Sequence, residues 1–138
     1  MNPIVDRVVI ANQLEVFLAP HGFEVAGAGA GGMGGWFKQF DSEEVIVLVG
    51  QDRSGEVVSI SIGSKVRCRP KAQMRGPWSM GHLRGFIEGN CEHFLFHTFD
   101  DQLIWFKAHF DYLNDSTFLN SDLLKEWSVK ASRLMFGG

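Results

Sequence analysis

Residues 45–67 read VIVLVGQDRSGEVVSISIGSKVR, and this stretch decides the fold. The run 45–49 is apolar at every position, which is typical of a strand that is covered on both faces. Over 58–63 apolar residues alternate with serine and glycine, the period of a strand with one buried face. The pattern therefore predicts a central antiparallel hairpin of residues 45–50 with 56–67.

The chain opens with the pattern of an amphipathic helix. Asn2 is a favoured N-cap residue, and Pro3 at the first helical position loses no backbone hydrogen bond. Apolar residues then recur at three- and four-residue spacing with polar residues between them, until Pro20 ends the pattern. We expect a helix over about 3–19.

A glycine-rich tract lies between this helix and the central hairpin. Six of the nine residues over 27–35 are glycine, and strands are expected on either side, over 23–26 and 36–40. Residues 27–32 match the dinucleotide-binding motif G-x-G-x-x-G, but that motif needs a helix immediately after it. We therefore interpret the tract as a hairpin loop, or as strands that approach too closely for a side chain.

The C-terminal third is expected to be helical. A short helix is predicted over 79–87, and Thr98 with Asp101 forms a variant capping box. A helix after this box is expected to bury the stripe Leu103, Ile104, Phe106, Phe110 and Leu113, and a last helix from about residue 120 to bury Leu123, Leu124, Trp127, Ala131 and Leu134. The predicted class is thus α+β: an N-terminal helix, a central antiparallel β-meander of about four strands and a helical C-terminal third, in one domain spanning 1–138.

Composition favours a globular protein of the cytoplasm. The chain of 138 residues is 45% hydrophobic, with twelve Phe and four Trp, which is ample material for a core. The two cysteines, Cys68 and Cys91, do not make a disulfide framework. No apolar run approaches the roughly 20 residues that span a bilayer, and no signal-peptide pattern opens the sequence. We expect no membrane association.

Charge is sharply segregated along the chain. Residues 65–84 carry six basic side chains and no acidic one, whereas residues 1–64 have a net charge of −5 and residues 85–138 a net charge of −4. The candidate partner-binding residues are the cations and interleaved aromatic rings of this segment: Lys65, Arg67, Arg69, Lys71, Arg75, Trp78, His82 and Arg84. Arginine with tryptophan is typical of the centres of protein interfaces, and also of nucleic-acid contacts.

Two further interpretations of this segment stay open. The cations can simply balance the carboxylates of the rest of the chain, and a charged edge strand also deters aggregation. Nucleic acid is a weaker alternative to a protein partner, because the whole chain has a net charge of −3 and dedicated nucleic-acid binders are usually basic.

A second cluster, Cys91 with His93 and His97, carries metal-ligand and nucleophile residue types. On a strand all three side chains would lie on one face, and His82 or His109 would complete a zinc site. The spacing matches no familiar zinc motif, and no glycine-framed turn surrounds the cysteine. Core packing explains the cluster as well, so we predict no catalytic residue, metal or cofactor.

The sequence therefore favours a non-enzymatic cytosolic protein that binds a macromolecule, most simply another protein, through the 65–84 segment. The outline of helix, meander and helices is shared by many small bacterial interaction proteins, including toxin-immunity proteins and secretion chaperones. The alternatives are a nucleic-acid-binding module that uses the same segment, and a small enzyme or metal-binding domain that uses Cys91 with His93 and His97. The sequence does not specify an oligomeric state.

Overall fold

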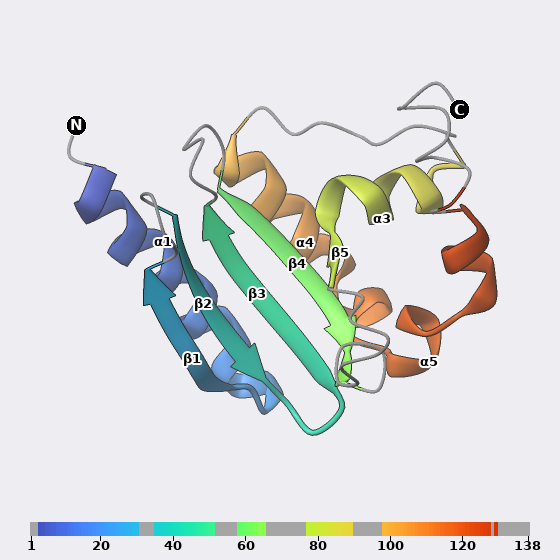
Figure 1. The fold of residues 1–138 in the computed structure, drawn as a ribbon, viewed down its shortest axis with the longest axis horizontal. Coiled ribbons are helices and arrows are strands. Elements are labelled where there is room, and N and C mark those ends of the chain that lie inside the picture. Colours follow the sequence, from blue (N-terminus) through green and yellow to red (C-terminus); the bar gives the residue numbers. More distant parts are fainter. Residues whose placement is uncertain are drawn as a thin grey trace.

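The computed structural model describes residues 3–30, 35–51, 58–65, 77–89, 98–127 and 129. A helix precedes a five-stranded antiparallel meander, and further helices follow it (Figure 1), so the predicted α+β class is confirmed. The elements are α1 (Pro3–Leu18), the 3-10 turn η1 (Ala19–His21), β1 (Glu24–Ala30), β2 (Trp36–Asp41), β3 (Val45–Gln51), β4 (Ser59–Ser64), β5 (Trp78–Ser79), α3 (Met80–Ile87), α4 (Phe99–Leu113) and α5 (Ser116–Leu119).

The five strands are hydrogen-bonded in the order in which they occur in the chain. The predicted central hairpin is β3 with β4, in a register that places Val47 opposite Ile62 and Val49 opposite Ile60. These four side chains are fully buried. Register follows from the hydrophobic pattern, because a slip of one residue would turn every apolar side chain of β4 to the other face.

The first half of the glycine tract belongs to β1 and not to a loop. Gly27 pairs with Gln39 and Gly29 pairs with Phe37, and the expected strand over 23–26 continues to Ala30. A Cβ atom on Gly29 would lie 3.0 Å from the Phe37 ring. Gly29 therefore agrees with the second interpretation, in which neighbouring strands approach too closely for a side chain. Residues 31–34 lie outside the described residues.

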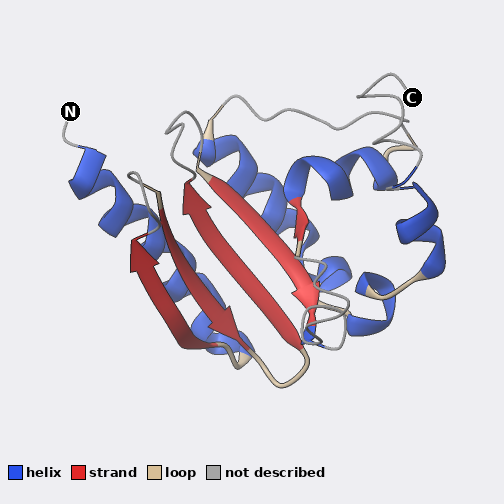
Figure 2. Ribbon diagram, viewed as in Figure 1, coloured by secondary structure: helices blue, strands red, loops and turns tan. Residues whose placement is uncertain are grey.

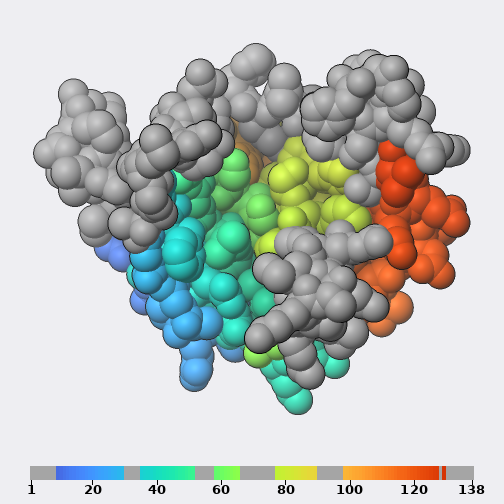
Figure 3. Space-filling model, viewed as in Figure 1, coloured from blue at the N-terminus to red at the C-terminus, as the bar shows by residue number. Residues whose placement is uncertain are grey.

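Helices α1 and α4 pack on the same face of the sheet (Figure 2). Leu14 and Leu18 of α1 join Phe106, Phe110 and Leu113 of α4 in one buried cluster with the inner side chains of the strands. Figure 3, in the same view, looks onto the other face of the sheet, where atoms of β2, β3 and β4 lie at the surface. The apolar run of β3 is accordingly not equally covered on both faces: its odd-numbered valines are buried, and its even-numbered side chains are partly exposed.

A side chain of α4 completes the edge of β4 that β5 leaves uncovered. The amide nitrogen of Gln102 donates to the carbonyl oxygen of Val58 over 3.0 Å. Its amide oxygen accepts a hydrogen bond from the backbone N–H of Ile60. Because Gln102 is 4% exposed, these two bonds satisfy backbone groups that water does not reach.

Helices α3 and α4 begin where the sequence predicted, and Thr98 is the predicted capping residue. Ser79 caps α3 by accepting from the backbone N–H of His82, and Thr98 caps α4 by accepting from that of Asp101. Two burial predictions are wrong: Ile104 is 67% exposed and Leu123 is 70% exposed. The stripe buried on α4 runs through positions three and four residues apart, and Ile104 is turned roughly 100° from Leu103, out of this stripe.

Candidate functional site

Hydrogen bonds to the rest of the fold flank the N-terminal part of the basic segment on both sides. Residues 65–77, called the basic connection below, link β4 to its antiparallel neighbour β5 and carry five cations and no carboxylate. At one end Ser64 donates its hydroxyl to Asn120 over 2.7 Å. At the other end the Trp78 indole donates to the carbonyl oxygen of Leu119 over 3.0 Å. Two consecutive residues at the C-terminal end of α5, Leu119 and its C-cap Asn120, thus fix both ends of the connection.

The first cation of the connection is already engaged with the protein itself. The ammonium of Lys65 lies 3.6 Å from the carboxylate of Asp41, and the backbone N–H of Lys65 donates to the Glu44 carbonyl over 2.9 Å. Arg84, in α3, pairs with Glu88 one turn later over 2.7 Å. For these two cations the charge-balancing interpretation therefore applies. Arg67, Arg69, Lys71 and Arg75 lie outside the described residues.

The aromatic members of the predicted site belong to the core. Trp78 is 6% exposed and His82 is 7% exposed. The His82 ring stacks on Trp78 with ring centroids 5.2 Å apart, and Trp127 meets it edge-on at 4.7 Å. Buried this way, the Trp78 indole presents no stacking surface to a ligand, and the basic connection is the part of the predicted site that remains.

An acidic depression, which sequence reasoning missed, adjoins the start of the basic connection. Glu43 and Glu44 of the β2–β3 turn face a space of about 570 Å³ together with Asp111, in the last turn of α4, and Asp115, just after α4. It is lined by His21, Gly22, Ser42, Glu43, Glu44, Val45, Asp111, Asn114, Asp115, Ser116 and Thr117. Val45 lies opposite Ser64 in the sheet, and the backbone N–H of Lys65 donates to the Glu44 carbonyl, so the start of the basic connection lies beside this depression. The segments are about 70 residues apart in sequence, for which no local pattern gives a signal.

Cys91, His93 and His97 lie outside the described residues. Of the histidines proposed to join them, His82 is in the core, and His109 stacks on Trp105 while its Nδ1 lies 2.9 Å from the Trp105 carbonyl oxygen. Within the described ranges, no group of three or more histidine, cysteine or acidic side chains is arranged to hold a metal ion.

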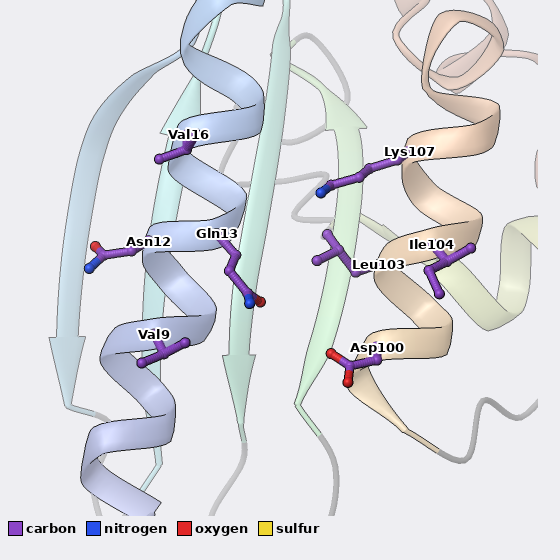
Figure 4. A pocket seen from close by; sticks show the side chains of 8 residues that line it. All are labelled: Val9, Asn12, Gln13, Val16, Asp100, Leu103, Ile104 and Lys107. Atoms are coloured by element: carbon purple, nitrogen blue, oxygen red, sulfur yellow. The ribbon is translucent and has the colours of Figure 1, made fainter.

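A groove of about 680 Å³ runs between α1 and α4 on the outside of the helical layer (Figure 4). It is lined by Val9, Asn12, Gln13, Val16, Asp100, Leu103, Ile104 and Lys107. Three of its apolar side chains are well exposed: Val9 at 47%, Val16 at 75% and Ile104 at 67%. The sequence pattern assigned the last of these to the core, which is why the groove was not predicted.

No protein-family model, no curated protein and no solved structure matches this chain. Among the helices that the structure describes, none is long and apolar enough to cross a membrane.

Proposed function

We propose that this chain is a non-enzymatic binding protein of the bacterial cytoplasm that engages an acidic protein partner through the basic connection. The observation that carries the proposal is five cations in 13 residues with no carboxylate, on a connection whose two ends are both fixed to the fold. Loops held by a rigid scaffold are where proteins place binding residues. A toxin-immunity protein or a secretion chaperone would use a surface of this kind to bind its partner.

The chemistry of the cations favours a protein partner with exposed carboxylates. Arginine makes forked hydrogen bonds to carboxylates, and complementary charge raises the rate of association. Lys65 and Arg84 are paired with Asp41 and Glu88. We therefore assign the partner's carboxylates to the arginines and lysine between them, Arg67, Arg69, Lys71 and Arg75.

The test is affinity capture from the native host with three baits. The first bait is the unaltered protein, and the second is the triple charge reversal Arg67→Glu, Arg69→Glu, Arg75→Glu. The third makes the same change of net charge outside the connection, with Lys125→Glu, Lys130→Glu and Arg133→Glu. A partner retained by the first and third baits and lost by the second supports the proposal, whereas equal capture by all three overturns it.

A stability measurement on the same proteins separates binding from charge balance. If the cations serve chiefly to neutralise the acidic depression, the triple reversal should unfold at a clearly lower temperature than the matched control. If they serve a partner, the two reversed proteins should unfold within a few degrees of each other. A large stability loss in the triple reversal alone, with capture unchanged, assigns the cations to the fold.

The nucleic-acid alternative is tested with defined probes. A gel-shift assay at low salt uses a 30-base-pair DNA and a 30-nucleotide RNA, and binding by phosphate contacts falls steeply as salt rises. A shift that disappears in the triple reversal and persists in the matched control replaces the protein partner by nucleic acid. The absence of any shift at low salt removes this alternative.

A further inference from the structure

The groove between α1 and α4 has a charge pattern that is complementary to itself. Asp100 lies at one end of the groove and Lys107 at the other, both on α4, with Ile104 between them (Figure 4). Seven residues of helix separate the two charges by two turns, or about 10 Å. The ammonium of Lys107 lies 5.4 Å from the centre of the Phe17 ring, which places this charge at the boundary between the two helices.

A two-fold axis perpendicular to α4, passing near Ile104, would bring unlike charges together. It would place α4 of a second copy against α4 of the first, with the two helices antiparallel. Asp100 of each copy then faces Lys107 of the other, and the two Ile104 side chains meet at the axis. In a two-fold interface each copy supplies the same surface, so that surface must complement itself.

We propose that this groove is a homodimer interface and that its occupant is a second copy of this chain. The apolar centre supplies burial, because Ile104 at 67% and Val16 at 75% are the most exposed apolar side chains of the groove. The charged ends supply direction, because a parallel arrangement would place like charges together. A dimer of this kind goes beyond the proposed function and does not depend on the basic connection.

The first experiment measures mass in solution as a function of concentration. Sedimentation equilibrium of the full chain should show a species of twice the 15.4 kDa chain mass. Ile104→Asp places two carboxylates at the axis and should weaken dimerisation by about 30-fold or more, as expected for an anchor at the centre of an interface. Leu123→Asp makes the same kind of change at a side chain outside the groove and should leave the mass unchanged.

The second experiment reports on the pairing of the charges. Asp100→Lys leaves two lysines in each groove and Lys107→Asp leaves two aspartates, so each variant alone should dimerise about tenfold more weakly or worse. Mixing the two variants restores unlike pairs at both ends and should restore the dimer. The double variant Asp100→Lys, Lys107→Asp should also dimerise within about threefold of the unaltered chain, because both pairs are simply inverted.

Matched controls and contrary outcomes are defined for both experiments. Asp122→Lys mixed with Lys125→Asp tests general charge attraction outside the groove and should change nothing. Far-UV circular dichroism identifies any variant that fails to fold. Only the folded variants are then used in the mixing experiment, which tests the proposed dimer. A monomer at every concentration up to about 1 mM, a dimer that survives Ile104→Asp, or no recovery on mixing overturns the proposal. A monomer whose host partner is lost on Ile104→Asp assigns the groove to another protein.

Discussion

The indole nitrogen of Trp78 lies 3.0 Å from the carbonyl oxygen of Leu119, and this bond fixes the point where the basic connection re-enters the sheet. The ring is 6% exposed and stacks on His82. Position 119 is 41 residues further along the chain. A residue that the sequence offers as a binding surface is thereby an anchor for the segment that precedes it.

Replacing this anchor should loosen the connection. Trp78→Phe leaves the Leu119 carbonyl without its indole donor and removes part of a buried ring, so we expect a loss of about 2 kcal/mol in the free energy of unfolding. Trypsin cleavage within 65–77 should also become faster. Trp36→Phe is the matched control, because it removes an indole bond of the same 3.0 Å length, to Gln51. Faster cleavage in both variants would show that the bond at Trp78 has no specific effect on the connection.

Gln102 should be the polar side chain of α4 on which stability depends most. Gln102→Leu leaves the carbonyl of Val58 and the N–H of Ile60 without their partners, which should cost about 2–4 kcal/mol in the free energy of unfolding. Urea denaturation measures this loss. Lys125→Leu, at an exposed position outside the groove, is the control and should change the free energy by less than about 0.5 kcal/mol.

Gln102→Glu gives the same site a dependence on pH. The introduced carboxyl is buried and faces the Val58 carbonyl oxygen, so its pKa in the folded protein should rise above that in the unfolded chain. The destabilisation should then be largest near neutral pH and should shrink as the pH falls from about 7 to about 5, because the protonated acid can donate to that carbonyl. Unfolding midpoints measured against the unaltered protein across this range test the sign.

A close approach between β2 and β3 should make Gly50 irreplaceable. A Cβ atom on Gly50 would lie 2.8 Å from the carbonyl oxygen of Trp36, a backbone atom that cannot move aside without distorting β2. Gly50→Ala should therefore cost about 1–3 kcal/mol in thermal or urea unfolding. Gly27→Ala is the control, since nothing lies within 4 Å of its added methyl group, and it should be neutral or slightly stabilising.

The salt dependence of binding tests the nature of the proposed partner. Once a partner is captured, raising salt from about 50 to about 500 mM should slow its association roughly tenfold and change its dissociation much less, because exposed charges act chiefly on the encounter rate. Surface plasmon resonance measures both rates. An association rate that does not change with salt would contradict a role for the cations.

Local patterns in the sequence were sufficient for α1, the central strands and the starts of α3 and α4, but they did not predict β5 or α5. The alternation of β4, the helical spacing of α1 and the capping residue Thr98 depend on neighbours within one turn or one strand. The burial of the candidate site residues could not be predicted from such patterns. Arginine and tryptophan in one segment indicate a surface, but burial depends on what packs against each residue from elsewhere in the chain.

The sequence by itself determined the α+β class, the meander and the segregation of charge, because periodicity and composition are properties of neighbouring residues. Only the tertiary structure decided that Trp78 lies in the core and fixes the basic connection, and that Glu44 and Asp115 line one depression. It also decided that Ile104 opens into a groove between two helices. Each of these depends on contacts between residues far apart in the chain, for which a local pattern carries no signal.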